Sequence, residues 1–148
     1  MIKFWQRWLA ILAGAIILVG LAMILFAGTS LFAPIDQPTF AAFFGDTVPP
    51  AALEYHRFMI ALNGAVTAGW GVMIFFLAWH PFGRGERWAW WALAASVGAW
   101  FVLDTAVALS FGAAAYALFN LAVLIAIDLP LLATARSFLG DRRQLAAA

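Results

Sequence analysis

Four long apolar segments constrain this chain more than any other feature. A helix needs about 20 mainly apolar residues to cross a hydrocarbon layer about 30 Å thick. Segments that meet this requirement cover residues 8–27, 51–79, 88–110 and 113–135. Charged residues make up only 10% of the chain, against about 25% in a soluble domain. The sequence therefore predicts an all-α fold: one membrane domain over residues 1–148, in which four transmembrane helices form an antiparallel bundle.

The first apolar segment follows Lys3 and Arg7, as the core of a signal peptide would. Its apolar run exceeds the usual core of about 7–15 residues, and no clean small-residue cleavage site follows it. We expect it to be retained as a transmembrane span.

The distribution of basic residues predicts the direction of the four spans. Seven of the eight basic residues fall on one side if the chain crosses four times: Lys3, Arg7, Arg84, Arg87, Arg136, Arg142 and Arg143. Cytoplasmic segments carry an excess of lysine and arginine, and tryptophan favours the headgroup region. Six tryptophans lie near the same side: Trp5, Trp8, Trp79, Trp88, Trp90 and Trp91. These two signals predict a multi-pass protein of the bacterial inner (plasma) membrane, with both termini and the loop between the second and third spans in the cytoplasm.

The long outer loop, residues 28–50, holds four of the six prolines. Within it, "PTFAAFFGD" could form a short interfacial helix, with Pro38 in its first turn and Gly45 as its C-terminal cap. Its phenylalanines, Phe40, Phe43 and Phe44, would then face the membrane or cover the outer end of the bundle. The alternative is a surface loop stiffened by proline.

Small residues allow helices to approach closely in lipid, where apolar burial gives little driving force. The second span has the pairs Ala61/Ala65 and Ala65/Gly69, the third has several alanines, and the first has Ala10/Gly14. The clustering in the second and third spans, which a short loop joins, predicts that these two spans form the central hairpin.

Polar residues at matching depth predict an outer cluster. Its members are Glu54, His56 and Arg57 in the second span, Asp104 in the third and Asn120 in the fourth. Arg57 breaks the charge pattern, and an unpaired charge at the centre of a span costs about 2.5–3.5 kcal/mol. We therefore expect it to pair with Glu54 or with Asp104. The cluster is then a structural clamp to which Asn120 donates, or a binding or proton-access site that opens outward. In a third interpretation Arg57 extends to the outer headgroups.

A second polar layer is expected near the midplane, formed by Asn63, Ser96 and Asp128. Pro130 lacks an N–H and crowds the carbonyl of Ala126, so the fourth span should kink there. Because no deep cation is available, we expect Asp128 to be protonated and hydrogen-bonded to Asn63 or Ser96. Its role is structural or interfacial, or it handles protons or a solute.

Several kinds of site are disfavoured. The chain has no cysteine, and His56 and His80 lie 24 positions apart, which is about 36 Å along a helix. Glu54 and His56 point to different helix faces. We therefore expect no metal and no cofactor. The net charge of +1 gives no sign of a nucleic-acid partner. The expected surroundings are the lipid bilayer and, as a protein partner, another membrane protein or a second copy of this chain.

The stretch "EYHRFMIALNGAVTAGWGVMIFFLAWHPFGRGERWAWWALAASVGAWFVLD" resembles small bacterial four-span integral membrane proteins of unknown function. The resemblance lies in an acidic, aromatic and small-residue second span followed by a tryptophan-rich third. It contains no diagnostic motif, so it implies no catalytic or binding residue.

Three functions remain open from the sequence. The first is a non-catalytic subunit or scaffold of an inner-membrane assembly, favoured by short loops and missing catalytic motifs. The second is a proton-coupled or small-solute transporter that uses Arg57, Asp104, Asn63 and Asp128. The third is a membrane enzyme acting on a lipid or quinone, with Glu54, His56 and Asp104 as acid–base candidates.

Overall fold

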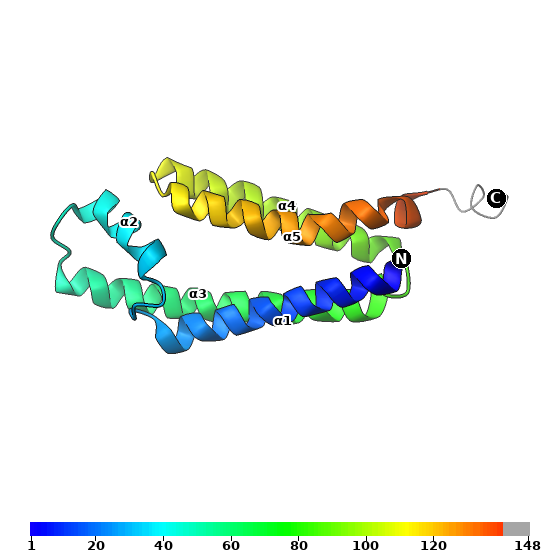
Figure 1. The fold of residues 1–148 in the computed structure, drawn as a ribbon, viewed down its shortest axis with the longest axis horizontal. Coiled ribbons are helices and arrows are strands. Elements are labelled where there is room, and N and C mark those ends of the chain that lie inside the picture. Colours follow the sequence, from blue (N-terminus) through cyan, green and yellow to red (C-terminus); the bar gives the residue numbers. More distant parts are fainter. Residues whose placement is uncertain (141–148) are drawn as a thin grey trace.

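A computed structural model of the protein describes residues 1–140, and every regular element within them is a helix (Figure 1). The elements are α1 (Ile2–Phe26), α2 (Ala33–Phe44), α3 (Pro50–Leu77), a π-helical segment η1 (Ala78–Phe82), α4 (Arg87–Ser110) and α5 (Ala114–Leu139). The all-α prediction is confirmed. The predicted cytoplasmic residues Arg142 and Arg143 lie outside the described residues.

Four helices are long and apolar enough to cross a membrane: α1, α3 together with η1, α4 and α5. Each matches one predicted span, although α1 begins at Ile2 and α5 continues to Leu139. The apolar pattern marks only the apolar part of each helix. The backbone hydrogen bonds of the helix can continue beyond that part into the interface, so the helices are longer than the patterns.

The segment between the first two spans contains a helix rather than only a loop. Pro34 lies at the start of α2, where a missing N–H costs nothing. Gly45 ends the helix at a φ of 63°, and its N–H donates to the carbonyl of Ala41. The helical interpretation of this segment is confirmed, with a start five residues before Pro38.

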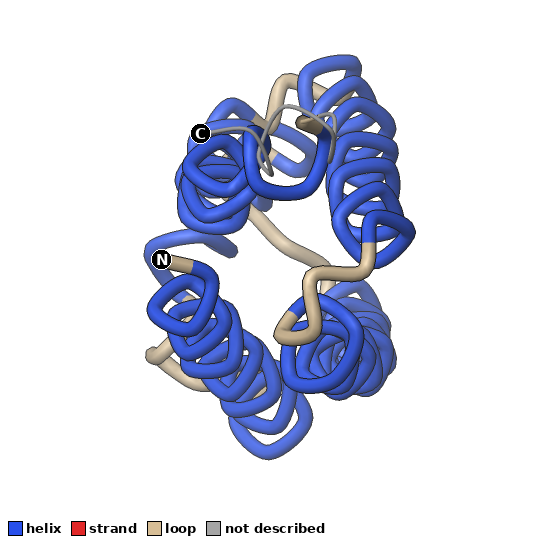
Figure 2. The backbone as a smooth tube through the Cα atoms, turned by 90° about the vertical axis from the view of Figure 1, so that its right-hand side faces the viewer, coloured by secondary structure: helices blue, strands red, loops and turns tan. Residues whose placement is uncertain are grey.

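The four long helices lie in two pairs. Figure 1 shows α1 alongside α3 and α4 alongside α5, and Figure 2, along the molecule's long axis, again separates the two pairs. Although a short turn joins α3 to α4, these helices have few contacts with each other. The predicted central hairpin of the second and third spans is therefore wrong.

Glycines explain why α3 packs on α1. A Cβ atom on Gly20 of α1 would lie 2.5 Å from the backbone nitrogen of Ala68, and one on Gly64 of α3 would lie 2.6 Å from the carbonyl oxygen of Gly20. A Cβ on Gly71 would lie 2.9 Å from the nitrogen of Ile17. The two backbones touch along this line, so α3 presents its glycine face to α1 and turns other faces toward α4.

The buried apolar core lies at one end of the molecule, which we call the closed end. This end holds the N-terminus, the turn between η1 and α4, and the end of α5 (Figure 1). The core residues come from all four long helices and η1 and include Leu9, Ala13, Ile74, Phe82, Leu93, Val97, Ile127, Leu131 and Phe138. At the opposite end, the open end, the two pairs separate and α2 lies between them (Figure 1).

Side chains at the closed end donate to carbonyl groups near the prolines. Gln6 Nε2 donates to the carbonyl of Trp79 over 2.7 Å, within the π-helical segment that contains Pro81. Trp8 Nε1 donates to Ala126 over 3.0 Å, and Trp90 Nε1 donates to Leu131 over 2.9 Å. Trp90 was predicted to anchor in the headgroups but is buried, because its N–H is used within the core.

Candidate functional site

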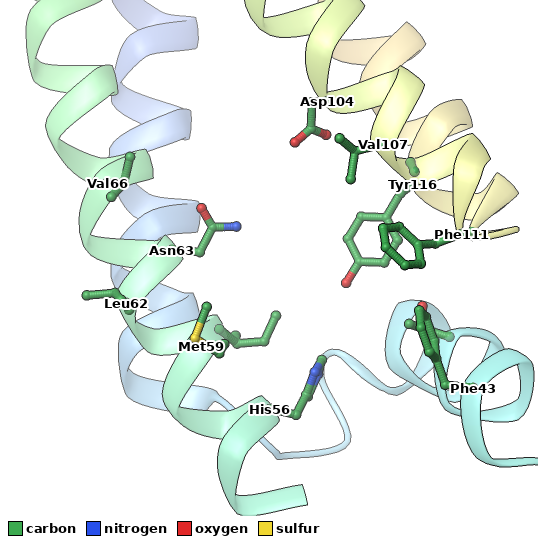
Figure 3. Close-up of a pocket in the computed structure, with 14 residues that line it drawn as sticks. Phe43, His56, Met59, Leu62, Asn63, Val66, Asp104, Val107, Phe111 and Tyr116 are labelled. Atoms are coloured by element: carbon green, nitrogen blue, oxygen red, sulfur yellow. The ribbon is translucent and has the colours of Figure 1, made fainter. Parts of the chain in front are cut away.

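A cavity of about 490 Å³ lies at the open end between the two helix pairs. Its lining comes from α2, α3, α4, α5 and the turn between α4 and α5. Most of the lining is apolar and aromatic, and includes Phe43, Met59, Leu62, Val66, Val107 and Phe111. The polar side chains of the lining are Thr39, His56, Asn63, Asp104 and Tyr116. Figure 3 shows His56 and Asn63 on one side of the cavity and Asp104 and Tyr116 on the other.

The α3 side of the cavity is one helix face. His56 and Asn63 are seven residues apart, which is close to two helical turns, so both project from the same side. Met59 and Val66 lie on this side as well and line the cavity with them. The face is directed across the cavity because the Gly64 and Gly71 face is already occupied by α1.

Asp104 is held by a buried amide. Asn120 Nδ2 donates to Asp104 Oδ2 over 2.7 Å and also lies 3.2 Å from Thr105 Oγ1. Asn120 is only 2% exposed, so its amide is fixed between α4 and α5. The expectation that Asn120 donates into the outer cluster is confirmed for Asp104. Among the described residues, no hydrogen bond reaches the second carboxylate oxygen, Oδ1, and Asp104 lines the cavity.

The predicted ion pair between Arg57 and Asp104 is not formed. Arg57 is exposed, and its aliphatic stem lies against Gly28 after the end of α1, where a Cβ on Gly28 would be 3.5 Å from Arg57 Cδ. Within residues 1–140, the side chains at ion-pair distance are His56 with Asp36 and Arg84 with Glu86, so Arg57 pairs with neither Asp104 nor Glu54. Arg57 misses Asp104 because of its direction around the axis of α3. Neighbouring residues on a helix point about 100° apart, so when His56 points into the cavity, Arg57 points toward α1.

Asp36 of α2 is the partner of His56. Its Oδ1 lies 3.1 Å from His56 Nε2, and Asp36 is 6% exposed. The Nε2 atom is buried and makes no aligned hydrogen bond within the described part of the chain. The ring of Phe40 meets the imidazole edge-on, with centroids 4.6 Å apart. These contacts fasten α2 to α3 at the mouth of the cavity.

The predicted midplane layer does not assemble into one network. Ser96 Oγ donates to the carbonyl of Leu93 on its own helix, and Asn63 lines the cavity. Within residues 1–140, no hydrogen bond joins Asp128 to Asn63 or to Ser96, and Asp128 does not line the cavity. Its neighbour Ala126 receives the Trp8 N–H, so the disturbed turn before Pro130 is satisfied by an indole rather than by the aspartate.

The proposed acid–base set comes together only in part. His56 and Asp104 both line the cavity, but Glu54 is exposed and is not among the lining residues. Among the described residues, no three His, Cys, Asp or Glu side chains lie close enough to hold a metal ion.

Sequence reasoning missed Tyr116 and the role of Asp36. Tyr116 precedes Asn120 by four residues and therefore lies on the same face of α5, a signal that the spacing contains. No spacing in the sequence indicates the role of Asp36, because its contact with His56 depends on how α2 lies against α3.

We compared the chain with protein-family models, curated proteins and solved structures, and none of the three comparisons found a match.

Proposed function

We propose that this protein is an integral membrane protein that binds a small amphiphilic molecule in the cavity at its open end, as the binding step of small-solute transport. The observation that carries the proposal is the cavity of about 490 Å³, lined by apolar and aromatic side chains with a few polar groups. Small-molecule sites have this composition and a volume of about 300–1,000 Å³.

The position of the cavity supports an amphiphile rather than a fully hydrated solute. The cavity lies between helices that are apolar enough to span a membrane. Its polar groups can receive the head of a ligand, while Leu62, Val66 and Val107 can cover an apolar body. Space between the two helix pairs lacks dispersion contacts while it is unfilled, so an apolar molecule that enters it gains them.

The orientation belongs to the same proposal. The closed end carries Lys3, Arg7, Arg84, Arg87 and Arg136, and we assign it to the cytoplasm of a bacterial inner membrane by the positive-inside rule. The helices then run antiparallel across the bilayer with both termini inside. The cavity and α2 face the outer leaflet, so a ligand enters from outside or from the outer half of the membrane.

The experiment fills the cavity in the full chain reconstituted in phosphatidylcholine nanodiscs. Val107→Trp places an indole among the lining residues. Val102→Trp is the matched control, because Val102 lies on the same helix, has a similar exposure (62% against 57%) and does not line the cavity. The probe is an uncharged dansyl-labelled alkyl amide, measured by energy transfer from tryptophan after subtraction of the signal from empty nanodiscs.

We expect Val107→Trp to weaken the probe's binding by about tenfold or more, which is ~1.4 kcal/mol. Val102→Trp should change it little, once its added tryptophan is allowed for in the transfer signal. Equal affinity in the two variants, or no saturable binding in the wild-type protein, would reject the cavity as a binding site.

A role as a non-catalytic subunit is a second candidate, favoured by glycines on outward faces. A Cβ atom on Gly14 of α1, Gly69 of α3 or Gly98 of α4 would have nothing within 4 Å. Small residues on a free helix face allow a helix of another membrane protein, or of a second copy, to approach closely.

A further inference from the structure

The carboxylate of Asp104 faces the cavity without a cationic partner. Its Oδ2 atom accepts from Asn120, which is a neutral amide. The cavity-lining His56 is at ion-pair distance from Asp36, and Arg57 lies against Gly28. Within residues 1–140, no basic side chain lies within ion-pair distance of Asp104. Asp104 therefore presents its second carboxylate oxygen to the cavity, with no basic side chain of the described residues beside it.

Aromatic rings lie on the side of the cavity nearest α2. The rings of Phe43 and Phe111 have centroids 5.7 Å apart, and Tyr116 lies on the same side (Figure 3). A cation within about 6 Å of an aromatic centroid is attracted by the negative face of the ring, and ammonium ligands are recognised in this way. The attraction increases when water is excluded.

The two features select the same ligand chemistry. A carboxylate oxygen attracts a cation and repels an anion, and both interactions grow stronger as less water screens them. The opposite wall carries His56 and Asn63, and between them it has the apolar side chains of Met59, Leu62 and Val66, which can cover a hydrocarbon chain. The ligand should therefore combine one positive charge with an apolar body.

We propose that the cavity binds an amphiphilic ammonium ion, with its positive group between Asp104 and the rings of Phe43, Phe111 and Tyr116. This inference rests on the proposed function and names its ligand class. Asn120 is a positioning residue, since it holds Oδ2 and leaves Oδ1 for the ligand.

The experiment compares three competitors that share one alkyl chain and differ only in the head. They carry a trimethylammonium group, its uncharged tert-butyl isostere, and a sulfonate. Each displaces the uncharged dansyl amide from the full chain in micelles of a non-ionic maltoside detergent, because phosphatidylcholine itself carries a trimethylammonium head. The isosteric pair has the same shape, so their difference in affinity measures the charge.

We expect the trimethylammonium compound to bind about tenfold more tightly than its isostere, which corresponds to ~1.4 kcal/mol, and the sulfonate to bind least. Asp104→Asn should remove the difference between the isosteres, while Asp128→Asn, a carboxylate outside the cavity, should preserve it. If Asp104→Asn does not fold, the isosteric pair still tests the inference on the wild-type protein.

The outcomes separate the two proposals. Equal affinity for the isosteres, or tightest binding of the sulfonate, overturns the ammonium inference and leaves the cavity as a binding site. A cation preference that survives Asp104→Asn also overturns it. Loss of displacement by every competitor, together with no effect of Val107→Trp, rejects the proposed function itself.

Discussion

At the scale of single residues, Pro130 lies within α5 and has no N–H for the carbonyl of Ala126. The indole of Trp8, from α1, donates to that oxygen over 3.0 Å. Thr134 Oγ1 in turn donates to the carbonyl of Pro130 over 2.6 Å. The carbonyl of Ala126, which Pro130 leaves without its backbone donor, is therefore occupied by an indole from the neighbouring helix.

This arrangement predicts a specific coupling between Trp8 and Pro130. Trp8→Phe should lower the free energy of unfolding by about 0.6–1.7 kcal/mol, the range for hydrogen bonds within membranes. In a Pro130→Ala background the cost should fall toward zero, because the new amide of residue 130 can donate to Ala126. Unfolding in mixed denaturing and mild detergents, followed by circular dichroism, measures both costs.

Trp90→Phe is the control for this cycle. Its indole donates to Leu131, a carbonyl that Pro130 does not leave unpaired, so its cost should be the same in both backgrounds. If Trp8→Phe also costs the same with and without the proline, the indole is not compensating for the missing donor.

At the scale of elements, the α1–α3 pair is defined by backbone contact. The atoms nearest to added Cβ atoms on Gly20 and Gly64 include the backbone of the facing helix, which cannot turn aside as a side chain can. The α4–α5 pair is fixed differently, in part by the Asn120–Asp104 hydrogen bond. The two pairs are therefore separate units, joined mainly through the core at the closed end.

Alanine at these glycines should separate α1 from α3. We expect Gly20→Ala and Gly64→Ala each to lower the free energy of unfolding by about 1–3 kcal/mol, the usual cost of overpacking. Gly14→Ala and Gly69→Ala meet nothing within 4 Å and should raise it by about 0.5–1 kcal/mol through helix propensity. The same detergent unfolding measures all four variants, and equal stabilities would contradict backbone contact at Gly20 and Gly64.

At the scale of the whole molecule, the core is confined to one end and the cavity to the other. The largest buried apolar side chains lie toward the closed end. Toward the open end, the buried residues include the polar Asp36 and Asn120. This asymmetry holds the two helix pairs together at the closed end and leaves space between them where α2 lies (Figure 1).

The proposed orientation predicts which end reacts with an impermeant thiol reagent. The chain has no cysteine, so a single introduced thiol can be followed without background. Thr47→Cys lies between α2 and α3 at the open end, and Ser137→Cys lies near the end of α5; both positions are exposed and uncharged. In intact cells with the outer membrane permeabilised, we expect labelling of residue 47 and not of residue 137.

Residue 137 should become reactive once the inner membrane is opened. Labelling of Ser137→Cys alone in intact cells would reverse the orientation, and it would place the cavity on the cytoplasmic side.

Part of the site could be predicted from the sequence. Depth counting placed Asp104 and Asn120 together, because both residues lie six or seven positions from one tight turn. It also placed Arg57 at the depth of Asp104. Depth along a helix does not tell in which direction around the axis a side chain points, so the predicted pair was wrong. The contact between Asp36 and His56 depends on the path of α2, for which no periodic pattern exists.

The pattern of residues is enough to predict four apolar helices, their positions along the chain and the places where basic residues gather. These properties follow from hydrophobicity and from local backbone hydrogen bonding, which act within one helix. Two further features depend on how the helices pack: α1 pairs with α3, and Asp104 faces a cavity rather than the side chain of Arg57. The reason is that in lipid every apolar face is equally soluble, so steric fit between backbones, rather than apolar burial, selects the partners.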